Sequence, residues 1–375
     1  MEEIHLFIIW SKALDKENEI ISDIKKSFDI LCLTKITWDK DKFSENLSRF
    51  YGENLPKDSN KENHCGNDTF SCIVVKDNTP IYKTRNTSKG DRVVNVNLFD
   101  AKQLYRSWTG GGHKIHATDN VEETKFQTML LFGRSYNYYL DLKDDKKIDF
   151  NRHDKLIGEN GWKSLESVFI TLNETFQYII LRNFEFIEDE LNSEHPDIDL
   201  LVEDVIGVSN LLNAKRTSNK KNRVQYQVLI ANKLINLDLR CIGDNYYYKN
   251  WQIHMLLNRV KESYYYQPCI EDHYYSLLYH ALYHKAKLGN DYKEKLLKLK
   301  QDINPTLNER DIDLGLNGFL CEINSFILEN KYKITQPNDY SVYWNYRLNF
   351  KIKVTWNLRR LIYRMPYFFK RLLNR

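Results

Sequence analysis

The chain has 375 residues, enough for two or three domains. Hydrophobic residues make up 42% and charged residues 28% of it, which is typical of a soluble globular protein. The formal net charge is only +4, so the chain as a whole does not have the charge of a strong polyanion binder, and nucleic acid is not an expected partner.

The cysteines and the first residues indicate a compartment. The six cysteines are scattered and form no C-x-x-C pair, which argues against a zinc site or a disulfide framework. The opening "MEEIHLFIIWSK" has acidic residues first and a short apolar run, unlike a signal peptide or a membrane span. We therefore expect a cytoplasmic protein.

The first 140 residues predict an α/β domain, because short apolar runs alternate with segments of helical spacing. Gly133 is expected to end the last of these helices. In chain order the pattern predicts strand 4–10, helix 13–28, strand 29–38, helix 40–51, loop 53–67, strand 70–77, helix 98–108, Gly-rich turn 108–120 and helix 121–133.

A charged connector over 141–155 is expected to separate this domain from the next. The second part predicts helix 163–175, strand 178–186, a strand within "SEHPDIDLLVED" (193–204), a hairpin over 224–243 around Ala231-Asn232, and helices from about 250. The expected fold class is thus α/β, with an N-terminal domain (1–140), a second α/β module (156–250), a helical region (251–339) and a tail (340–375).

Three aspartates carry the main chemical signal. Asp197 and Asp199 are two residues apart in an apolar run, so on a strand both point to one face. Asp238 alternates with apolar residues in the same way in "INLDLRC". Two adjacent strands can bring these carboxylates to one rim, where they can bind Mg²⁺ or Mn²⁺, bridge nucleotide phosphates and activate a hydroxyl.

The succession of "YIILRN" (178–183), "HPDIDLLVED" and "LDLR" resembles the nucleotidyltransferase (polymerase-beta-like) superfamily over about residues 160–290. The closest kinds are bacterial members found with capsule and cell-wall glycan genes. The resemblance implies a mixed-sheet nucleotidyltransferase module, with Asp197 and Asp199 as metal ligands and Asp238 as the third carboxylate and general base.

This chain departs from the family at one turn. The family has Gly-Ser or Gly-Gly there and holds nucleotide phosphate through backbone N–H groups, whereas this sequence has Arg182-Asn183. The arginine side chain can itself hold a phosphate. Arg182, Asn183 and Arg240 are therefore expected to bind substrate.

Helical spacing places His273, His280 and His284 on one face of "EDHYYSLLYHALYHK" (271–285). Histidines four residues apart can ligate zinc, but a structural or substrate-facing role is the favoured interpretation, with His280 in the substrate site. Glu271, Asp272 and Lys285 are expected to contribute to an acceptor pocket.

In the N-terminal domain, "RSWTGGGHKIHAT" combines a glycine run with cations, a composition that suits a phosphate although it is not a P-loop. The alternative is a flexible hairpin with incidental charges. The expected binding residues are Arg106, Gly110, Gly111, Gly112, His113, Lys114 and His116, with Arg85, Lys89, Asn95, Asn97, Asp100 and Lys102 upstream.

The tail over 340–375 has nine Lys or Arg and no acid, interleaved with aromatic and aliphatic residues. Such a segment can lie on an anionic membrane surface, contact nucleic acid, or pack on the body with a solvated basic face. Membrane contact is favoured, which would make the protein peripheral at the inner face of the membrane.

These features together predict a metal-dependent transferase of phosphorus-containing groups. It would move a nucleotidyl, phospho-alcohol or phosphosugar group from a nucleotide-linked donor to a glycan or phospho-alcohol acceptor, in capsule or cell-wall polysaccharide synthesis. The alternatives are an RNA-directed or toxin-type nucleotidyltransferase, and a non-catalytic ligand-binding scaffold with a degenerate module.

Overall fold

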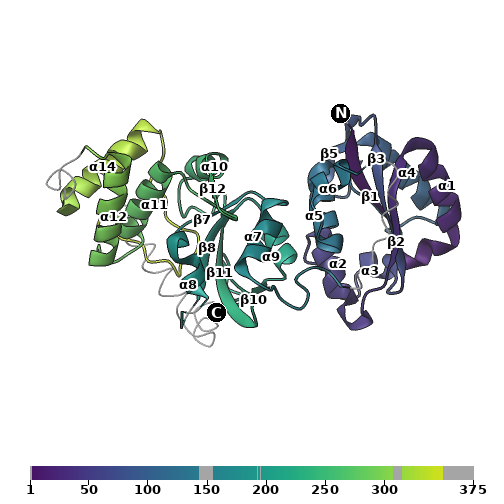
Figure 1. Cartoon of the computed structure of the whole chain (residues 1–375), viewed down its shortest axis with the longest axis horizontal. Helices are drawn as coiled ribbons and strands as arrows, with labels where there is room; N and C mark the ends of the chain where they lie inside the picture. The colour runs from purple at the N-terminus through teal and green to yellow at the C-terminus, as the bar shows by residue number, and fades with distance from the viewer. Residues whose placement is uncertain (1, 143–154, 192, 195, 307–314, 349–375) are drawn as a thin grey trace, which may run out of the picture. The chain divides into compact units, whose positions relative to one another are not determined.

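A computed structural model describes residues 2–142, 155–191, 193–194, 196–306 and 315–348. Contacts within the chain divide it into two compact units. The first comprises residues 1–162 together with 206–213, and the second comprises residues 163–205 and 214–375. The chain thus has the predicted α/β class, with sheets in both units and helices in the C-terminal part (Figure 1).

The first unit is built on an antiparallel sheet in the order β2-β3-β1-β6. Its central strand β1 is buried along nearly its whole length, which explains why the sequence is apolar at consecutive positions rather than at alternate ones. The strands are β1 (Glu3–Ile9), β2 (Asp29–Ile36), β3 (Phe70–Asp77) and β6 (Ile115–Ala117), with a separate hairpin of β4 (Tyr82–Thr87) and β5 (Gly90–Asn95).

Helices cover both faces of this sheet (Figure 1). The residues of β1 and β3 that face α1 and α4, such as Phe7 and Ile73, share one apolar core with Ile24 and Leu98 of those helices. The helical elements are η1 (Ser11–Lys16), α1 (Glu17–Ser27), η2 (Lys40–Lys42), α2 (Phe43–Tyr51), α3 (Asn60–Cys65), α4 (Val96–Trp108), α5 (Val121–Phe132) and α6 (Tyr136–Leu140).

Arg49 of α2 attaches residues 206–213 to the first unit. Its buried guanidinium donates to the carbonyl oxygens of Asn210 (2.8 Å) and Leu211 (3.1 Å) in α9 (Val205–Leu212), and to that of Ile157 (2.6 Å). Burial lowers the pKa of Arg49 to about 10, so it stays charged at neutral pH. Arg49 thereby supplies each of the three carbonyl groups with a charged hydrogen-bond donor.

The second unit contains a mixed sheet in the order β7-β8-β11-β10-β9. Strands β8 and β11 run parallel at its centre, and their neighbours run antiparallel to them. The strands are β7 (Tyr178–Ile180), β8 (Asp197–Val202), β9 (Lys215–Arg216), β10 (Gln225–Ile230) and β11 (Lys233–Cys241).

Helices α10, α11, α12 and α14 pack around an aromatic core that also receives Ile179 of β7 and Leu201 of β8. Trp251 stacks on Tyr332 at 5.6 Å between ring centroids, and Tyr283 on Trp344 at 5.7 Å. The remaining elements of this unit are α7 (Leu165–Asn173), η3 (Phe184–Phe186), α8 (Ile187–Glu190), α10 (Lys249–Leu257), β12 (Val260–Glu262), β13 (Tyr265–Gln267), α11 (Ile270–Tyr283), α12 (Asn290–Ile303) and α14 (Gly315–Glu329).

Several local predictions are wrong. Helix α3 lies inside the predicted loop 53–67, capped by the Ser59 side chain, and strand β6 lies inside the predicted Gly-rich turn. The predicted strand 178–186 ends at Ile180, and its last three residues form the 3₁₀ helix η3. A β12–β13 hairpin interrupts the region expected to be helical from 250.

Other local predictions are confirmed. Gly133 ends α5 with a left-handed φ of +62°, and strands β10 and β11 form a hairpin with Ala231 and Asn232 at its turn. Most of the predicted connector and of the tail, residues 143–154 and 349–375, lies outside the described part. Within the described residues, no helix is long and apolar enough to cross a membrane.

The turn of the β10–β11 hairpin allows a stability test. Ala231 and Asn232 both have positive φ, +49° and +63°, as a type I′ turn requires, and alanine is disfavoured there by about 1–2 kcal/mol. Ala231→Asn should therefore stabilise the second unit by about 1 kcal/mol, measured by urea denaturation. Ala231→Val, the matched control, should destabilise it, and a gain in both variants would contradict the assigned turn.

Candidate functional site

The register of β8 and β11 brings two of the predicted aspartates side by side. Asp199 of β8 lies opposite Asp238 of β11, and Asp197 lies opposite Asn236. Because side chains alternate along a strand, all four point to the same face of the sheet. The side chains of Asp199 and Asp238 are 14% and 16% exposed, so two mostly buried carboxylates meet at one position.

These aspartates line a cavity of about 520 Å³ in the second unit. Strands β8 and β11 supply the aspartates and Arg240, helices α11 and α12 supply His280 and Tyr292, and segments outside the helices and strands supply the remainder. The lining residues are Arg182, Asn183, Asp197, Asp199, Arg223, Asp238, Arg240, Tyr246, His280, His284, Lys285, Ala286, Tyr292, Ser341, Val342 and Tyr343.

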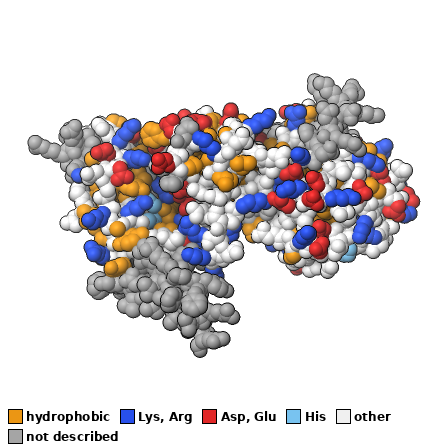
Figure 2. Space-filling model, turned by 90° about the horizontal axis from the view of Figure 1, so that it is seen from below, with side chains coloured by type: hydrophobic (Ala, Val, Ile, Leu, Met, Phe, Trp, Pro, Cys, Tyr) orange, Lys and Arg blue, Asp and Glu red, His pale blue; other side chains and the backbone are white. Residues whose placement is uncertain are grey.

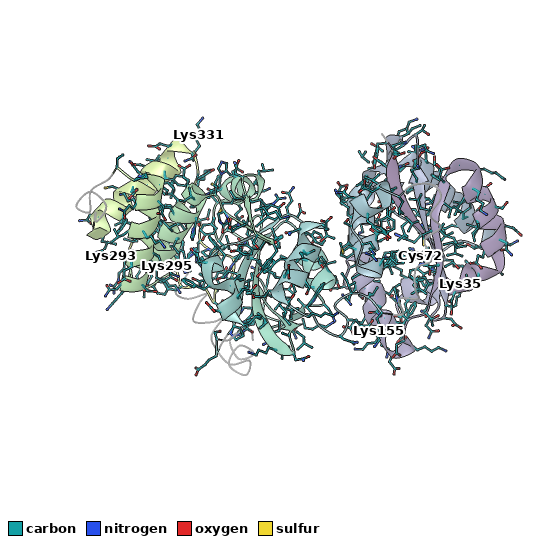
Figure 3. All side chains as sticks on the ribbon, in the orientation of Figure 1. Lys35, Cys72, Lys155, Lys293, Lys295 and Lys331 are labelled. Atoms are coloured by element: carbon teal, nitrogen blue, oxygen red, sulfur yellow. The ribbon has the colours of Figure 1, made fainter. Side chains whose placement is uncertain are left out.

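Arg182 places its positive charge directly on Asp199. Its Nη2 atom lies 2.6 Å from Oδ2 of Asp199, and its Nη1 atom donates to the hydroxyl of Tyr246 at 3.1 Å. The following residue, Asn183, has a left-handed φ of +58° and accepts a hydrogen bond from Lys295 of α12 (2.9 Å). Figure 3 labels Lys295. The Arg182-Asn183 turn therefore contacts both the aspartate strand β8 and helix α12.

Arg240 is the second buried cation of the cavity. It lies 3.6 Å from Oδ2 of Asp238 and 3.8 Å from Oδ2 of Asp244, and it stacks on the ring of Tyr246 at 4.1 Å. Its Nε and Nη1 atoms are buried without a hydrogen-bond partner. A buried guanidinium in this condition has donors left for a ligand or for water.

The protonation of Asp238 depends on its burial and on the charges of Arg240 and Asp199. Burial has the largest effect on the pKa of its carboxyl group and raises it; the positive charge of Arg240 opposes this shift, and the negative charge of Asp199 adds to it. A carboxylate with a raised pKa is a better proton acceptor than an ordinary aspartate.

Helix α11 contributes unequally to the site. His280 and His284 line the cavity with Lys285, but His273 packs on the ring of Phe184 at 4.6 Å between centroids, away from the lining residues. Asp272 is buried and accepts a hydrogen bond from Trp251 (2.8 Å), so it supports the helical core. Neither Asp272 nor Glu271 belongs to the cavity lining, where the sequence predicted an acceptor pocket. Burial lowers the pKa of both His280 and His284 well below 6.5, which keeps them neutral.

The donor chemistry of the three aspartates is the all-oxygen set that Mg²⁺ prefers. Among the described residues, however, no group of three or more His, Cys, Asp or Glu side chains is arranged to hold a metal ion. The guanidinium of Arg182 stands against Asp199, so it would have to move before a cation could bind there.

The glycine run of the first unit is used within the fold. Gly110, Gly111 and Gly112 all have positive φ, and the N–H of Gly111 bonds to the carbonyl oxygen of Arg106 at 2.7 Å, which closes helix α4. The N–H of His113 donates to Nδ1 of His64 at 3.3 Å. Phosphate binding through these groups stays a prediction.

The side chains around that run have partners as well. Arg106 donates to the carbonyl oxygen of Ile115 (2.9 Å), and Lys114 to that of Thr109 (2.5 Å). His116 is buried with Nε2 2.8 Å from Oε1 of Gln127. Burial lowers the pKa of His113 to about 4, and the positive charges of Arg106 and Lys61 add to this shift.

Upstream polar residues also support the fold. Asn95 and Asn97 both donate to Asp77, at 2.9 and 3.0 Å. Lys102 is buried and forms an ion pair with Asp119. Arg85 and Lys89 form ion pairs with Asp100 (3.0 Å) and Glu53 (2.5 Å).

The sequence analysis missed several cavity residues. Arg223 continues the alternation of Gln225 and Gln227 on β10, and Gln225 pairs with Asp238, so period-two spacing could have placed it on the same face. Tyr246, Tyr292 and the segment 341–343 carry no local pattern of this kind.

On the face shown in Figure 2, basic and acidic side chains are interspersed over the described surface of both units.

No family model matches the sequence, and no curated protein matches it either. Solved structures similar to this chain include the nucleoside diphosphate kinase of Aquifex aeolicus in an orthorhombic crystal form, at a TM-score of 0.25 and 16% identity, covering 34% of this chain and 93% of that one. Another is the nucleoside diphosphate kinase from Encephalitozoon cuniculi, at a TM-score of 0.23 and 12% identity, covering 40% and 95%. Similarities of this size establish neither a shared fold nor a function.

The surroundings of Asp238 lead to a prediction about its titration. Its pKa, followed by carbon NMR of the carboxyl group, should lie above the ordinary value of 3.8. Arg240→Gln should raise it further, because a nearby positive charge is removed, and Asp199→Asn should lower it. Arg223→Gln, the matched control, should raise it by less than Arg240→Gln does; a shift of the same sign in Arg240→Gln and Asp199→Asn would contradict the described cluster.

Proposed function

We propose that the second unit is the catalytic module of a metal-dependent transferase that moves a nucleotidyl, phospho-alcohol or phosphosugar group. The observation that carries this proposal is the register pairing of Asp199 with Asp238 on parallel central strands, beside Asp197 and within a cavity that also contains three arginines. Paired carboxylates and arginines in one cavity suit a phosphate ester, because arginine binds phosphate oxygens while carboxylates bind cations or accept protons.

In this proposal the arginines and the aspartates have different roles. Arg182, Arg223 and Arg240 bind the phosphate groups of a nucleotide-linked donor, and Asp238 accepts the proton of the acceptor hydroxyl. Asp197, Asp199 and Asp238 would hold Mg²⁺ or Mn²⁺, which when bound neutralises phosphate charge. Release of Arg182 from Asp199 would free the guanidinium to bind a phosphate group.

The kind of donor and acceptor rests on the sequence resemblance, which suggests surface-glycan synthesis. The first unit would bind a second phosphate-bearing ligand, supported by the positive charges of Arg106 and Lys61, which act on both His113 and His116. An RNA-directed or toxin-type nucleotidyltransferase would use the same aspartates with another acceptor.

The ion pair between Arg182 and Asp199 favours one alternative, a ligand-binding module without catalysis. A carboxylate neutralised by a permanent arginine does not need a cation. The two functions differ in whether ligand binding depends on a divalent metal.

Thermal unfolding distinguishes these functions. Mg²⁺ or Mn²⁺ with a nucleotide, tested over nucleoside triphosphates, CDP-alcohols and nucleotide sugars, should raise the melting temperature, equivalent to about 2.7 kcal/mol at a hundredfold excess over Kd. Asp197→Asn should abolish the metal-dependent part, since Asp197 is exposed at the start of β8 and its replacement leaves the core intact. Asp302→Asn on the exposed face of α12 is the control.

Two outcomes would decide against the transferase. Equal stabilisation with and without chelator, in the wild type and Asp197→Asn alike, would support the non-catalytic module. The absence of stabilisation by any nucleotide would contradict nucleotide binding altogether.

The proposed peripheral location at the inner face of the membrane rests on the tail, of which residues 349–375 lie outside the described part. The basic and aromatic composition should bind the full chain to vesicles with anionic lipid, and removal of 349–375 should release it. Flotation measures this binding, neutral vesicles are the control, and a full-length chain that stays unbound would contradict membrane association.

A further inference from the structure

A chain of hydrogen bonds leads from the aspartate strand to the helical wall of the cavity. Asp199 pairs with Arg182, which donates from Nη1 to the hydroxyl of Tyr246 at 3.1 Å. The Tyr246 hydroxyl lies 2.6 Å from Nδ1 of His280 on α11, and Nε2 of His280 lies 3.2 Å from the hydroxyl of Tyr292 on α12.

The arginine fixes the direction of every bond in this chain. A guanidinium only donates, so the oxygen of Tyr246 accepts from Arg182 and needs an acceptor for its own hydrogen. Tyr246 is 2% exposed, and His280 is its other described hydrogen-bond partner, so Nδ1 of His280 is that acceptor. A neutral imidazole that accepts at Nδ1 carries its proton at Nε2 and therefore donates to Tyr292.

The hydrogen of the Tyr292 hydroxyl is consequently directed away from His280. Tyr292 lines the cavity, and so does Lys285, whose Nζ atom lies 5.7 Å from the centre of the Tyr292 ring. Both side chains present donors on the helical wall, whereas the carboxylates lie on the sheet.

His284 gives an independent indication that this wall contacts a ligand. It is 3% exposed and lines the cavity, yet neither of its ring nitrogens has a hydrogen-bond partner. The rings of Tyr246 and Tyr279 lie 4.1 and 5.3 Å from it between centroids, so aromatic faces surround it. A buried polar atom without a hydrogen-bond partner destabilises the folded state unless a ligand or water forms a hydrogen bond with it.

We propose that Tyr292 and Lys285 form a second anion-binding subsite, which holds a phosphate or carboxylate group of the ligand on the helical wall of the cavity. The proposal rests on the proposed function in that it concerns the same cavity, but it requires neither metal nor catalysis. His280 is a positioning residue, because it directs the Tyr292 hydroxyl through the bond to Nε2. A bound anion accepts from the hydroxyl and from the ammonium group.

Histidine NMR on the full-length protein tests this subsite. With ¹⁵N-labelled histidine, His280 should have the Nε2-protonated tautomer at neutral pH. Titration with inorganic phosphate, without metal, should shift its Nε2 signal, because the anion polarises the Tyr292 hydroxyl to which Nε2 donates. Acetate in a parallel titration distinguishes a carboxylate-binding subsite from a phosphate-binding one.

Variants separate the subsite from the arginines. Tyr292→Phe and Lys285→Gln should each weaken the phosphate affinity, measured by calorimetry, about tenfold, as expected for a lost hydrogen bond to a charged group. Tyr248→Phe, at a tyrosine of the second unit outside the cavity lining, is the matched control and should leave it unchanged. Lys285 is exposed, so its substitution leaves the fold intact.

The contrary outcomes are distinct from a failure of the proposed function. A His280 signal that neither phosphate nor acetate moves, an Nδ1-protonated tautomer, or unchanged affinity in both variants would overturn the subsite. Loss of metal-dependent nucleotide binding with an intact phosphate response would instead overturn the transferase while the subsite stands.

Discussion

The site depends on one electrostatic constraint: the pairing of β8 with β11 places two carboxylates side by side. Like charges opposite each other on neighbouring strands destabilise a sheet, and burial adds the cost of removing them from water. This structure meets the constraint with Arg182 on Asp199 and Arg240 near Asp238. The arginines thereby balance the charge of the cavity, oppose the rise that burial causes in the pKa of Asp238, and make the contacts that reach the helical wall.

This balance of charge also links the sheet to the helices. Arg182 is held between Asp199 and Tyr246, and Tyr246 is in turn stacked under Arg240. A ligand that takes one arginine away from its carboxylate would change the partners of the whole group. The cavity is therefore a set of mutually dependent contacts, whether the ligand is a substrate or an effector.

The sequence predicts those features that depend on local periodicity. Alternation of apolar and acidic residues places Asp197, Asp199 and Asp238 on strands, and Ala231-Asn232 marks a turn where two residues need positive φ. It does not predict β6, because three residues beside a glycine run give no period, nor the partner of Arg182, because a long side chain can reach many carboxylates. Nor does the sequence predict that the glycine run closes helix α4, because its composition is equally typical of a phosphate site.

The attachment of residues 206–213 to the first unit affects how the chain acquires its structure during synthesis. The first unit is complete only when α9 reaches Arg49, so residues 163–205 of the second unit leave the ribosome before the first unit can close. A fragment ending near residue 162 would present the buried guanidinium of Arg49 without two of its three carbonyl acceptors. The two units are thus interleaved in the sequence, and the first can be completed only after residues 163–205 of the second have been synthesised.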